Sequence, residues 1–214
     1  WYYYKDEQIP NAEFNEWSAC EKLMSAQKPT HWYTIADVLG KHSGFGSFTP
    51  NTLVSKPSEG KVELQTQYST PGGGMIPGFI TLGKVTGNWG AAGSSSFGIS
   101  GGIPFHNSPD EIIFNYKLET VSTNNQIQYI LTGSDGASTL EWNESATSSS
   151  FKDYKYSLKQ ANDEAGEPTT LNILINSYKQ IDGTIVAAGA NMIVERIRLT
   201  YNHILTGLKV DAFD

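Results

Sequence analysis

Aromatic side chains flanked by an amide group or by a second ring occur at three places in the chain. They are Asn88 and Trp89, Trp142 and Asn143, and Trp32 and Tyr33. The flat face of an indole or phenol ring packs against the C–H face of a pyranose, and a neighbouring amide can hydrogen-bond to the sugar's hydroxyl groups. These six residues are therefore our candidates for binding a carbohydrate.

Burial in a core is the alternative role for each of these rings. In a β-sandwich most tryptophan and tyrosine side chains belong to the core or to cross-strand pairs. Trp89 lies in a glycine-rich stretch and Trp142 ends a predicted strand, so these two rank ahead of the third pair. Trp17 and Phe14, by contrast, are expected to pack under a sheet.

Side chains that could perform catalysis are present, but their spacing does not bring them together. Glycoside hydrolysis needs two facing carboxyl groups about 5 to 9.5 Å apart, a distance that a sequence does not contain. The four histidines include no i, i+4 pair for a metal ion, and the serines near glycines lack the strand-turn-helix pattern of a nucleophile elbow. The carboxylates considered for hydrolysis, each expected to be a solvated strand residue, are Glu63, Asp110, Glu111, Glu119, Glu141 and Glu195.

The charge balance excludes one large class of partners. The chain has 15 Lys and Arg against 22 Asp and Glu, a net charge of −7 and a pI of about 5.1, and its basic residues form no stripe. Because binding to nucleic acid needs clustered positive charge, we expect no nucleic-acid partner. No apolar run reaches the roughly 18 to 20 residues that a membrane-spanning helix needs, so we expect no membrane span.

The first residue and the one cysteine give two further expectations. The chain begins at Trp1 rather than at Met, which we interpret as a mature or trimmed chain whose export signal, if it had one, has been removed. Cys20 cannot form an internal disulfide, and we expect it to be buried as a small apolar residue.

Two-residue alternation of apolar and polar side chains dominates the chain from about residue 60 onward, and it predicts β-strands with one buried face. Residues 79–86 are apolar on both faces and predict an inner strand, with Gly83 as a bulge or a close approach of backbone. The alternating strands are predicted at residues 62–68, 112–118, 127–131, 171–175 and 191–201, with weaker patterns at 139–142 and 151–158.

Glycine- and serine-rich stretches at residues 69–78, 88–102 and 145–150 predict the connecting loops. Short helical turns are expected near residues 18–26 and 34–40. No linker or internal repeat divides the chain, so we predict one domain over residues 1–214, with 1–10 as either a linker or a first strand. The predicted fold class is an all-β, two-sheet β-sandwich.

Four short motifs follow one another between residues 11 and 201. They are Asn-Ala-Glu-Phe-Asn-Glu-Trp at 11–17 with Lys-Pro-Thr-His-Trp at 28–32, Gly-Lys-Val-Glu-Leu-Gln-Thr at 60–66, Gly-Ile-Pro-Phe at 102–105 with Phe-Asn-Tyr-Lys at 114–117, and the closing strand at 190–201. In this order they resemble the putative carbohydrate metabolism domain family of Bacteroidetes surface proteins. More broadly, they resemble the galactose-binding-like jelly rolls that accompany polysaccharide-degrading enzymes.

The resemblance implies a jelly-roll topology and a role linked to glycans. It also implies a secreted, periplasmic or outer-membrane surface location, commonly as a lipoprotein with its lipid anchor upstream of this segment. Relatives carry carboxylates that can help bind a structural calcium, at positions where this chain has Asn15 and the pair Glu195 and Arg196. Because calcium needs about six to eight oxygen ligands, the amide and the arginine weaken that site, and we predict no cofactor.

The leading functional hypothesis is therefore a carbohydrate-binding, glycan-utilisation accessory module whose partner is a polysaccharide or oligosaccharide. The first alternative is a glycoside hydrolase or lyase that acts in the sandwich groove. A further alternative is a structural or adhesive surface protein, which an exposed apolar patch would favour.

Overall fold

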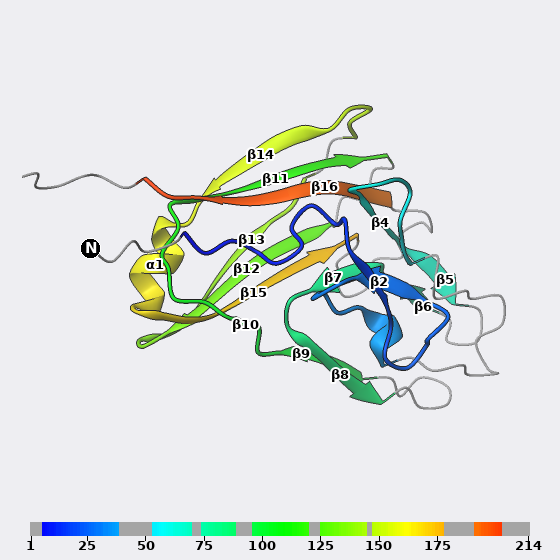
Figure 1. Ribbon diagram of the computed structural model, residues 1–214, viewed down its shortest axis with the longest axis horizontal. Helices are drawn as coiled ribbons and strands as arrows, with labels where there is room; N and C mark the ends of the chain where they lie inside the picture. Colours follow the sequence, from blue (N-terminus) through cyan, green and yellow to red (C-terminus); the bar gives the residue numbers. More distant parts are fainter. Residues whose placement is uncertain are drawn as a thin grey trace, which may run out of the picture.

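Two antiparallel sheets form the body of the structure (Figure 1). The computed structural model describes residues 6–38, 53–69, 74–88, 96–119, 125–144, 147–177 and 191–202. In the first sheet the strand order is β10 (Ile103–Pro104), β15 (Pro168–Asn176), β12 (Gln126–Gly133) and β13 (Gly136–Trp142), and β7 (Phe79–Thr81) also pairs with β15. In the second sheet the order is β14 (Lys152–Ser157), β11 (Glu111–Leu118), β16 (Asn191–Thr200), β4 (Val62–Gln65) and β3 (Val54–Ser55).

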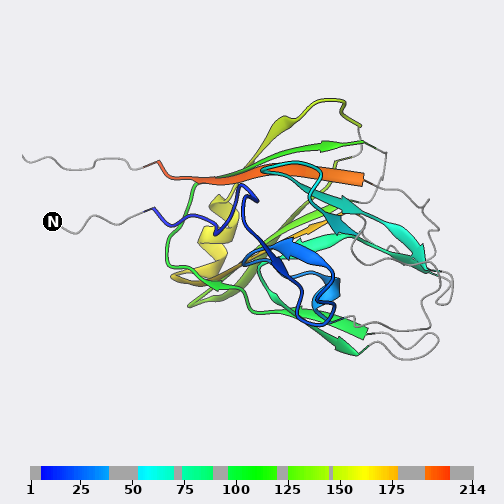
Figure 2. The same ribbon diagram turned by 45° about the vertical axis from the view of Figure 1, so that its right-hand side comes forward.

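Three two-stranded ribbons and two helical segments complete the described part of the chain. The ribbons are β1 (Trp17–Ala19) with β2 (Gln27–Pro29), β5 (Gln67–Ser69) with β6 (Gly74–Ile76), and β8 (Lys84–Asn88) with β9 (Ser96–Ser100). The helical segments are the 3-10 turn η1 (Ile35–Asp37) and the helix α1 (Lys159–Ala165), which lies at one end of the sandwich in both views (Figure 1, Figure 2). No helix among the described residues has the length and apolar character needed to cross a membrane.

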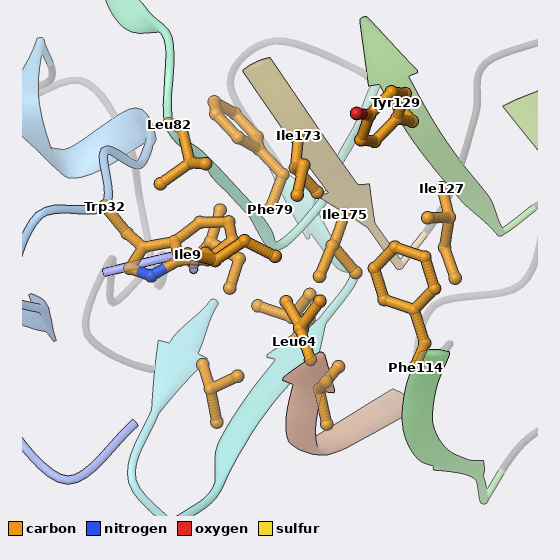
Figure 3. Close-up of a cluster of buried hydrophobic side chains, with 14 of the residues drawn as sticks. Ile9, Trp32, Leu64, Phe79, Leu82, Phe114, Ile127, Tyr129, Ile173 and Ile175 are labelled. Atoms are coloured by element: carbon orange, nitrogen blue, oxygen red, sulfur yellow. The ribbon is translucent and has the colours of Figure 1, made fainter. Parts of the chain in front are cut away.

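The alternating strands place their apolar side chains between the two sheets, as the sequence pattern predicts. Phe114 of β11 and Leu64 of β4 face Ile127 and Ile175 of the first sheet, and all four are fully buried (Figure 3). Burial of such side chains contributes roughly 1.5 to 3 kcal/mol each. The all-β sandwich prediction is confirmed, and the jelly-roll topology stays a prediction.

The N-terminal segment closes one edge of the sandwich. β16 pairs with β4 only over Asn191–Val194, which leaves the rest of that strand edge unpaired by β4. The backbone N–H of Ile197 donates to the carbonyl of Ala12 at 3.0 Å, and the N–H of Leu199 donates to Oε1 of Gln8 at 3.3 Å. Polar groups of the N-terminal segment thus accept hydrogen bonds from backbone N–H groups of β16 that would otherwise bond to water.

The motif at residues 11–17 has a structural role. Nδ2 of Asn11 donates to the carbonyl oxygens of Glu16 and Thr30, and Oδ1 of Asn11 accepts from the N–H of Glu16. Phe14 has a φ of 51° and a fully buried ring, and its carbonyl accepts from Nε1 of Trp17 at 2.8 Å. Burial of Phe14 is confirmed, while Trp17 is half-buried against the same core.

Several local predictions are wrong or incomplete. Residues 18–26 form no helical turn, because Trp17–Ala19 pairs with Gln27–Pro29 as a short ribbon. The predicted loops at 69–78 and 88–102 contain β6 and β9, whose pairing relies on backbone hydrogen bonds that glycine and serine also provide. The predicted strand at 79–86 is interrupted between β7 and β8.

Gly83 stands at that interruption, as the close-approach prediction requires. A Cβ at this position would lie 2.8 Å from Nδ2 of Asn172 and 2.8 Å from Cγ2 of Ile99. The N–H of Gly83 donates to Oδ1 of Asn172 at 2.7 Å, and Oγ1 of Thr81 donates to the same oxygen. The chain therefore turns around the Asn172 side chain, for which only glycine leaves room.

Sequence reasoning missed α1, although a signal for it is present. Leu158, Ala161 and Ala165 are buried at spacings of three and four residues, which is the pattern of a short amphipathic helix. Oγ of Ser138 donates to Glu164 at 2.6 Å, and Nδ2 of Asn162 donates to the carbonyl of Pro109. These bonds hold α1 against β13 and against the segment that precedes β11.

A buried ion pair stabilises the N-terminal segment. Lys28 and Asp37 are 7% and 3% exposed, and their side chains lie 2.8 Å apart. The Asp37 carboxylate also accepts from the N–H groups of Glu21 and Thr34 at 2.9 and 2.8 Å. Cys20 is buried beside this pair, as predicted, and burial, followed by the negative charge of Asp37, raises its pKa to about 12.

Replacing Lys28 with methionine should lower the free energy of unfolding by about 3 kcal/mol, because it leaves the Asp37 carboxylate buried without its cation. Lys56→Met is the matched control, since Lys56 pairs with Glu59 at the surface and such pairs contribute less than about 1 kcal/mol. Urea unfolding of both variants measures the difference. Equal losses of stability in the two variants would contradict a structural role for the buried pair.

Candidate functional site

The second open edge of the sandwich lies between β13 and β14, the terminal strands of the two sheets. Trp142 stands opposite Ile127, and Tyr154 stands opposite Phe114, so both rings point into the space between the sheets. Tyr156 points the same way, because it is two residues further along β14. Since these strands end their sheets, all three rings are only half-buried. We call Trp142, Tyr154 and Tyr156 the edge rings.

The edge rings are held by stacking. Trp142 stacks on Tyr156 with ring centroids 4.3 Å apart, and Tyr154 stacks on the buried Tyr116 at 4.2 Å, each pair at an interplanar angle of 16°. Phe114 packs at a tilt, 6.2 Å from both Trp142 and Tyr156. Such aromatic pairs contribute about 0.5 to 1.5 kcal/mol each beyond burial. The rings therefore form a fixed aromatic strip that retains exposed surface.

Polar groups border this strip at the end of β13. The hydroxyl of Tyr156 donates to Oε1 of Glu144 at 3.4 Å, and the N–H of Glu144 donates to Oδ1 of Asn125 at 2.9 Å. Nδ2 of Asn125 is buried and has no hydrogen-bond partner within the described part of the chain. Asn143, between Trp142 and Glu144, is exposed. An acceptor carboxylate and an amide thus stand beside the rings.

The tyrosine hydroxyls of the site remain protonated at neutral pH. Burial raises the pKa of Tyr156 to about 12, and the negative charge of Glu144 adds to the increase. Burial also raises the pKa values of Tyr116 and Tyr154. At Tyr116 the neighbouring Tyr156 and then Glu144 add to the increase, and at Tyr154 Glu144 does so. The Tyr156 phenol therefore serves as a hydrogen-bond donor to the Glu144 carboxylate.

The structure brings Trp142 and Asn143 together with two tyrosines that sequence reasoning did not select. Tyr154 and Tyr156 alternate within the predicted strand at 151–158, and that alternation was the available signal. The pairing of β14 with β11, which carries these rings to Trp142, depends on long-range contacts that no local pattern contains. Trp89 lies outside the described residues, and Asn88 ends β8 opposite Ser96.

Trp32 is a correction to the predicted site. Its side chain is fully buried among Ile9, Leu82 and Phe79 (Figure 3), and its Nε1 donates to the carbonyl of Pro10 at 3.3 Å. A ring without exposed surface cannot stack on a sugar. The N-terminal segment carries this ring into the core.

Tyr33 is half-buried and lies at the edge of the first sheet that is opposite to the edge rings. Its backbone bridges to Thr81 of β7, and β15 and β12 separate β7 from β13. The ammonium group of Lys28 lies 4.3 Å from the centre of the Tyr33 ring. The structure therefore does not unite Tyr33 with Trp142 in one site.

Two carboxylates considered for hydrolysis come close together on the outer face of the second sheet. Nδ2 of Asn191 donates to Glu63 at 2.6 Å and to Glu119 at 3.3 Å, so the two acceptor oxygens are within about 6 Å of each other. The other oxygen of Glu63 accepts from Ser55, and that of Glu119 pairs with Lys117. Both carboxylates are thus engaged by protein donors, and an amide fills the space between them.

The remaining carboxylates are placed in similar ways. Glu141 accepts from Gln126 and Gln128 at 2.8 and 2.9 Å, and Asp110 accepts from the N–H of Asn202. Glu111 lies on β11 and has intermediate exposure. At the edge rings, the Glu144 carboxylate accepts a hydrogen bond from the hydroxyl of Tyr156.

The two residues considered for calcium do not fit a cation site as the structure holds them. The Glu195 carboxylate lies 3.4 Å from the ammonium group of Lys61, which supplies the positive charge there. Nδ2 of Asn15 instead donates to Glu13 at 3.4 Å. Across the described ranges, no three His, Cys, Asp or Glu side chains gather closely enough to hold a metal ion.

A solved structure has a fold similar to that of this chain. It is a putative glycoside hydrolase from Bacteroides thetaiotaomicron, with a TM-score of 0.51 and 11% sequence identity. The similarity covers 74% of this chain and 60% of that one, so the chain spans about three fifths of that protein's length. No family model and no curated protein matches the sequence. At this identity the likeness shows the fold alone.

The raised pKa of Tyr156 predicts a loss of stability at alkaline pH. An unfolded tyrosine ionises near pH 10, so the contribution of Tyr156 is fully present below about pH 10 and is lost as the pH rises through about 12. When the pH is raised from about 8 to about 11.5, the free energy of unfolding should fall in both proteins. The fall should be roughly 1 to 2 kcal/mol smaller in Tyr156→Phe than in the wild type. Urea unfolding at both pH values measures this, and identical losses would contradict the assignment.

Proposed function

We propose that this chain is a non-catalytic carbohydrate-binding module of a glycan-utilisation system, and that it binds a polysaccharide or oligosaccharide at the edge rings. The observation that carries this proposal is the fixed stack of Trp142 on Tyr156 beside Asn143 and Glu144. The rings supply flat apolar faces for a pyranose, while the phenol oxygens, the Asn143 amide and the Glu144 carboxylate match its hydroxyl groups.

Two further observations support a glycan partner. The neighbour in fold is named as a putative glycoside hydrolase, and the motifs between residues 11 and 201 resemble a carbohydrate-related family of Bacteroidetes surface proteins. From the same resemblance we propose a secreted, periplasmic or outer-membrane surface location, with a lipid anchor upstream of this segment. Fold alone does not determine function, so the aromatic site carries the proposal.

The two alternatives have less support. Glycoside hydrolysis is favoured by the proximity of Glu63 and Glu119. However, all four oxygens of these two carboxylates already contact a donor group of the protein. An adhesive role would require an exposed apolar patch. Among the described residues, Met24 is the one large apolar side chain that is exposed.

Trp142→Ala and Asn143→Ala should each reduce retardation of the protein in affinity gels that contain its polysaccharide. We expect an affinity weaker by about fivefold or more for Trp142→Ala, because removing a stacking ring costs roughly 1 to 3 kcal/mol where nucleobases stack on aromatic side chains. Asn143 is exposed, so its replacement tests binding without a cost in stability. A panel of neutral and acidic glycans is needed, since the polysaccharide is to be identified in the same experiment.

Trp17→Ala is the matched control, because Trp17 is also half-buried against the core but lies in the N-terminal segment. It should leave retardation unchanged. Unchanged retardation in both site variants, or no retardation of the wild type on any glycan, would count against the proposed site.

Incubation of the wild-type protein with the glycan that it binds should release no reducing ends and no unsaturated products. The physical reason is that Glu63 and Glu119 are held by Asn191 rather than facing a substrate. Release of products that is abolished by Glu63→Gln or Glu119→Gln, with retardation intact, would establish the hydrolase or lyase alternative instead.

A further inference from the structure

A hollow of about 500 Å³ lies between the N-terminal segment and β16, away from the edge rings. Figure 1 and Figure 2 show the start of the described chain (blue) running beside β16 (orange-red). Ligand pockets in proteins commonly have volumes of about 300 to 1,000 Å³, so the hollow has room for a sugar unit. The polar side chains that line it are Gln8, Asn11, Glu13, Asn15, Glu16, Arg196 and Arg198.

One wall of the hollow carries only donors. Arg196 and Arg198 are both exposed and, two residues apart on β16, they extend from the same face of the strand about 6.5 Å apart. Arg196 is 3.9 Å from Asp153, but that carboxylate oxygen already accepts from Nδ2 of Asn115 at 2.7 Å. Arg198 has no ion pair with any described residue. These guanidinium groups therefore have capacity left for an anion.

The opposite wall carries carboxylates. Glu13 and Glu16 belong to the N-terminal segment and are exposed, and Glu13 is contacted by the Asn15 amide at 3.4 Å. Ionised carboxylates only accept hydrogen bonds, and guanidinium groups only donate them. A ligand that fits both walls offers acceptors, best of all an anion, to the arginines and donors such as hydroxyl groups to the carboxylates.

We infer that this hollow binds the carboxylate-bearing unit of an acidic glycan, a hexuronate, with the carboxylate on Arg196 and Arg198 and the ring hydroxyls on Glu13 and Glu16. A neutral hexose would leave the arginines with hydroxyl oxygens alone, which are weaker acceptors than a carboxylate. That the ligand is a sugar rests on the proposed function, whereas the binding of a carboxylate rests on the hollow itself.

Calorimetric titration with digalacturonic acid tests this inference on the full chain, with the neutral disaccharide of galactose as the comparison. Digalacturonic acid should bind at least tenfold more tightly than the neutral sugar, and its affinity should fall as salt is added. Arg198→Gln should weaken binding about tenfold or more, because it removes a charge-assisted contact. Arg198 is exposed, so this replacement should leave the fold intact, as thermal unfolding will verify.

Lys155→Gln is the matched control. Lys155 is exposed and stands across Ile113 from Arg198 on the same face of the second sheet, but it does not line the hollow. Equal losses in Arg198→Gln and Lys155→Gln would overturn the site in favour of general charge attraction. Equal binding of glutarate, which has carboxylates but no sugar ring, would overturn the assignment to a sugar acid.

The affinity-gel result separates this inference from the proposed function. If gels retard the wild type through Trp142 but digalacturonic acid does not bind, the hollow is not a uronate site and the carbohydrate-binding function stands. If digalacturonic acid binds through Arg198 and no gel retards the protein through Trp142, the inference holds and the edge rings are structural.

Discussion

Two stacked sheets have two long edges at which the core would meet water, and the closure of these edges is the constraint on which the rest of this structure depends. On one side the N-terminal segment covers β16 by hydrogen bonds from the Ala12 backbone and the Gln8 side chain, and it inserts Trp32 between the sheets. On the other side no further segment is available among the described residues, and Trp142, Tyr154 and Tyr156 close the edge with rings. An edge closed by side chains keeps part of those side chains exposed.

This difference between the two edges explains where recognition surfaces arise. The ring-closed edge is apolar, flat and bordered by Asn143 and Glu144, so it suits the faces of sugar rings. The chain-closed edge leaves a hollow whose walls are charged, with arginines on β16 and carboxylates on the N-terminal segment. Each surface arises from the way its edge is closed. The two differ in chemistry because aromatic rings close one edge and a chain segment with charged side chains closes the other.

The strands were predictable because two-residue alternation is a local property, and the alternating patterns at 112–118, 127–131 and 171–175 lie within β11, β12 and β15. The fate of single aromatic residues was not. Trp32 and Trp142 both follow polar stretches in the sequence, yet one is fully buried and the other half-exposed, because their burial depends on which edge each segment reaches. The pairing of β14 with β11 decides that Tyr154 and Tyr156 join Trp142, and strand pairing over long sequence separations has no local signature.

The central claim is that the edge rings contact a glycan while the buried indole does not. An NMR titration of the indole N–H signals with an oligosaccharide of the bound polysaccharide tests it most directly. The account predicts that the Trp142 signal shifts progressively and saturates, and that the Trp32 signal, bonded to the carbonyl of Pro10, stays in place. Saturable shifts elsewhere in the chain with an unmoved Trp142 signal would contradict it.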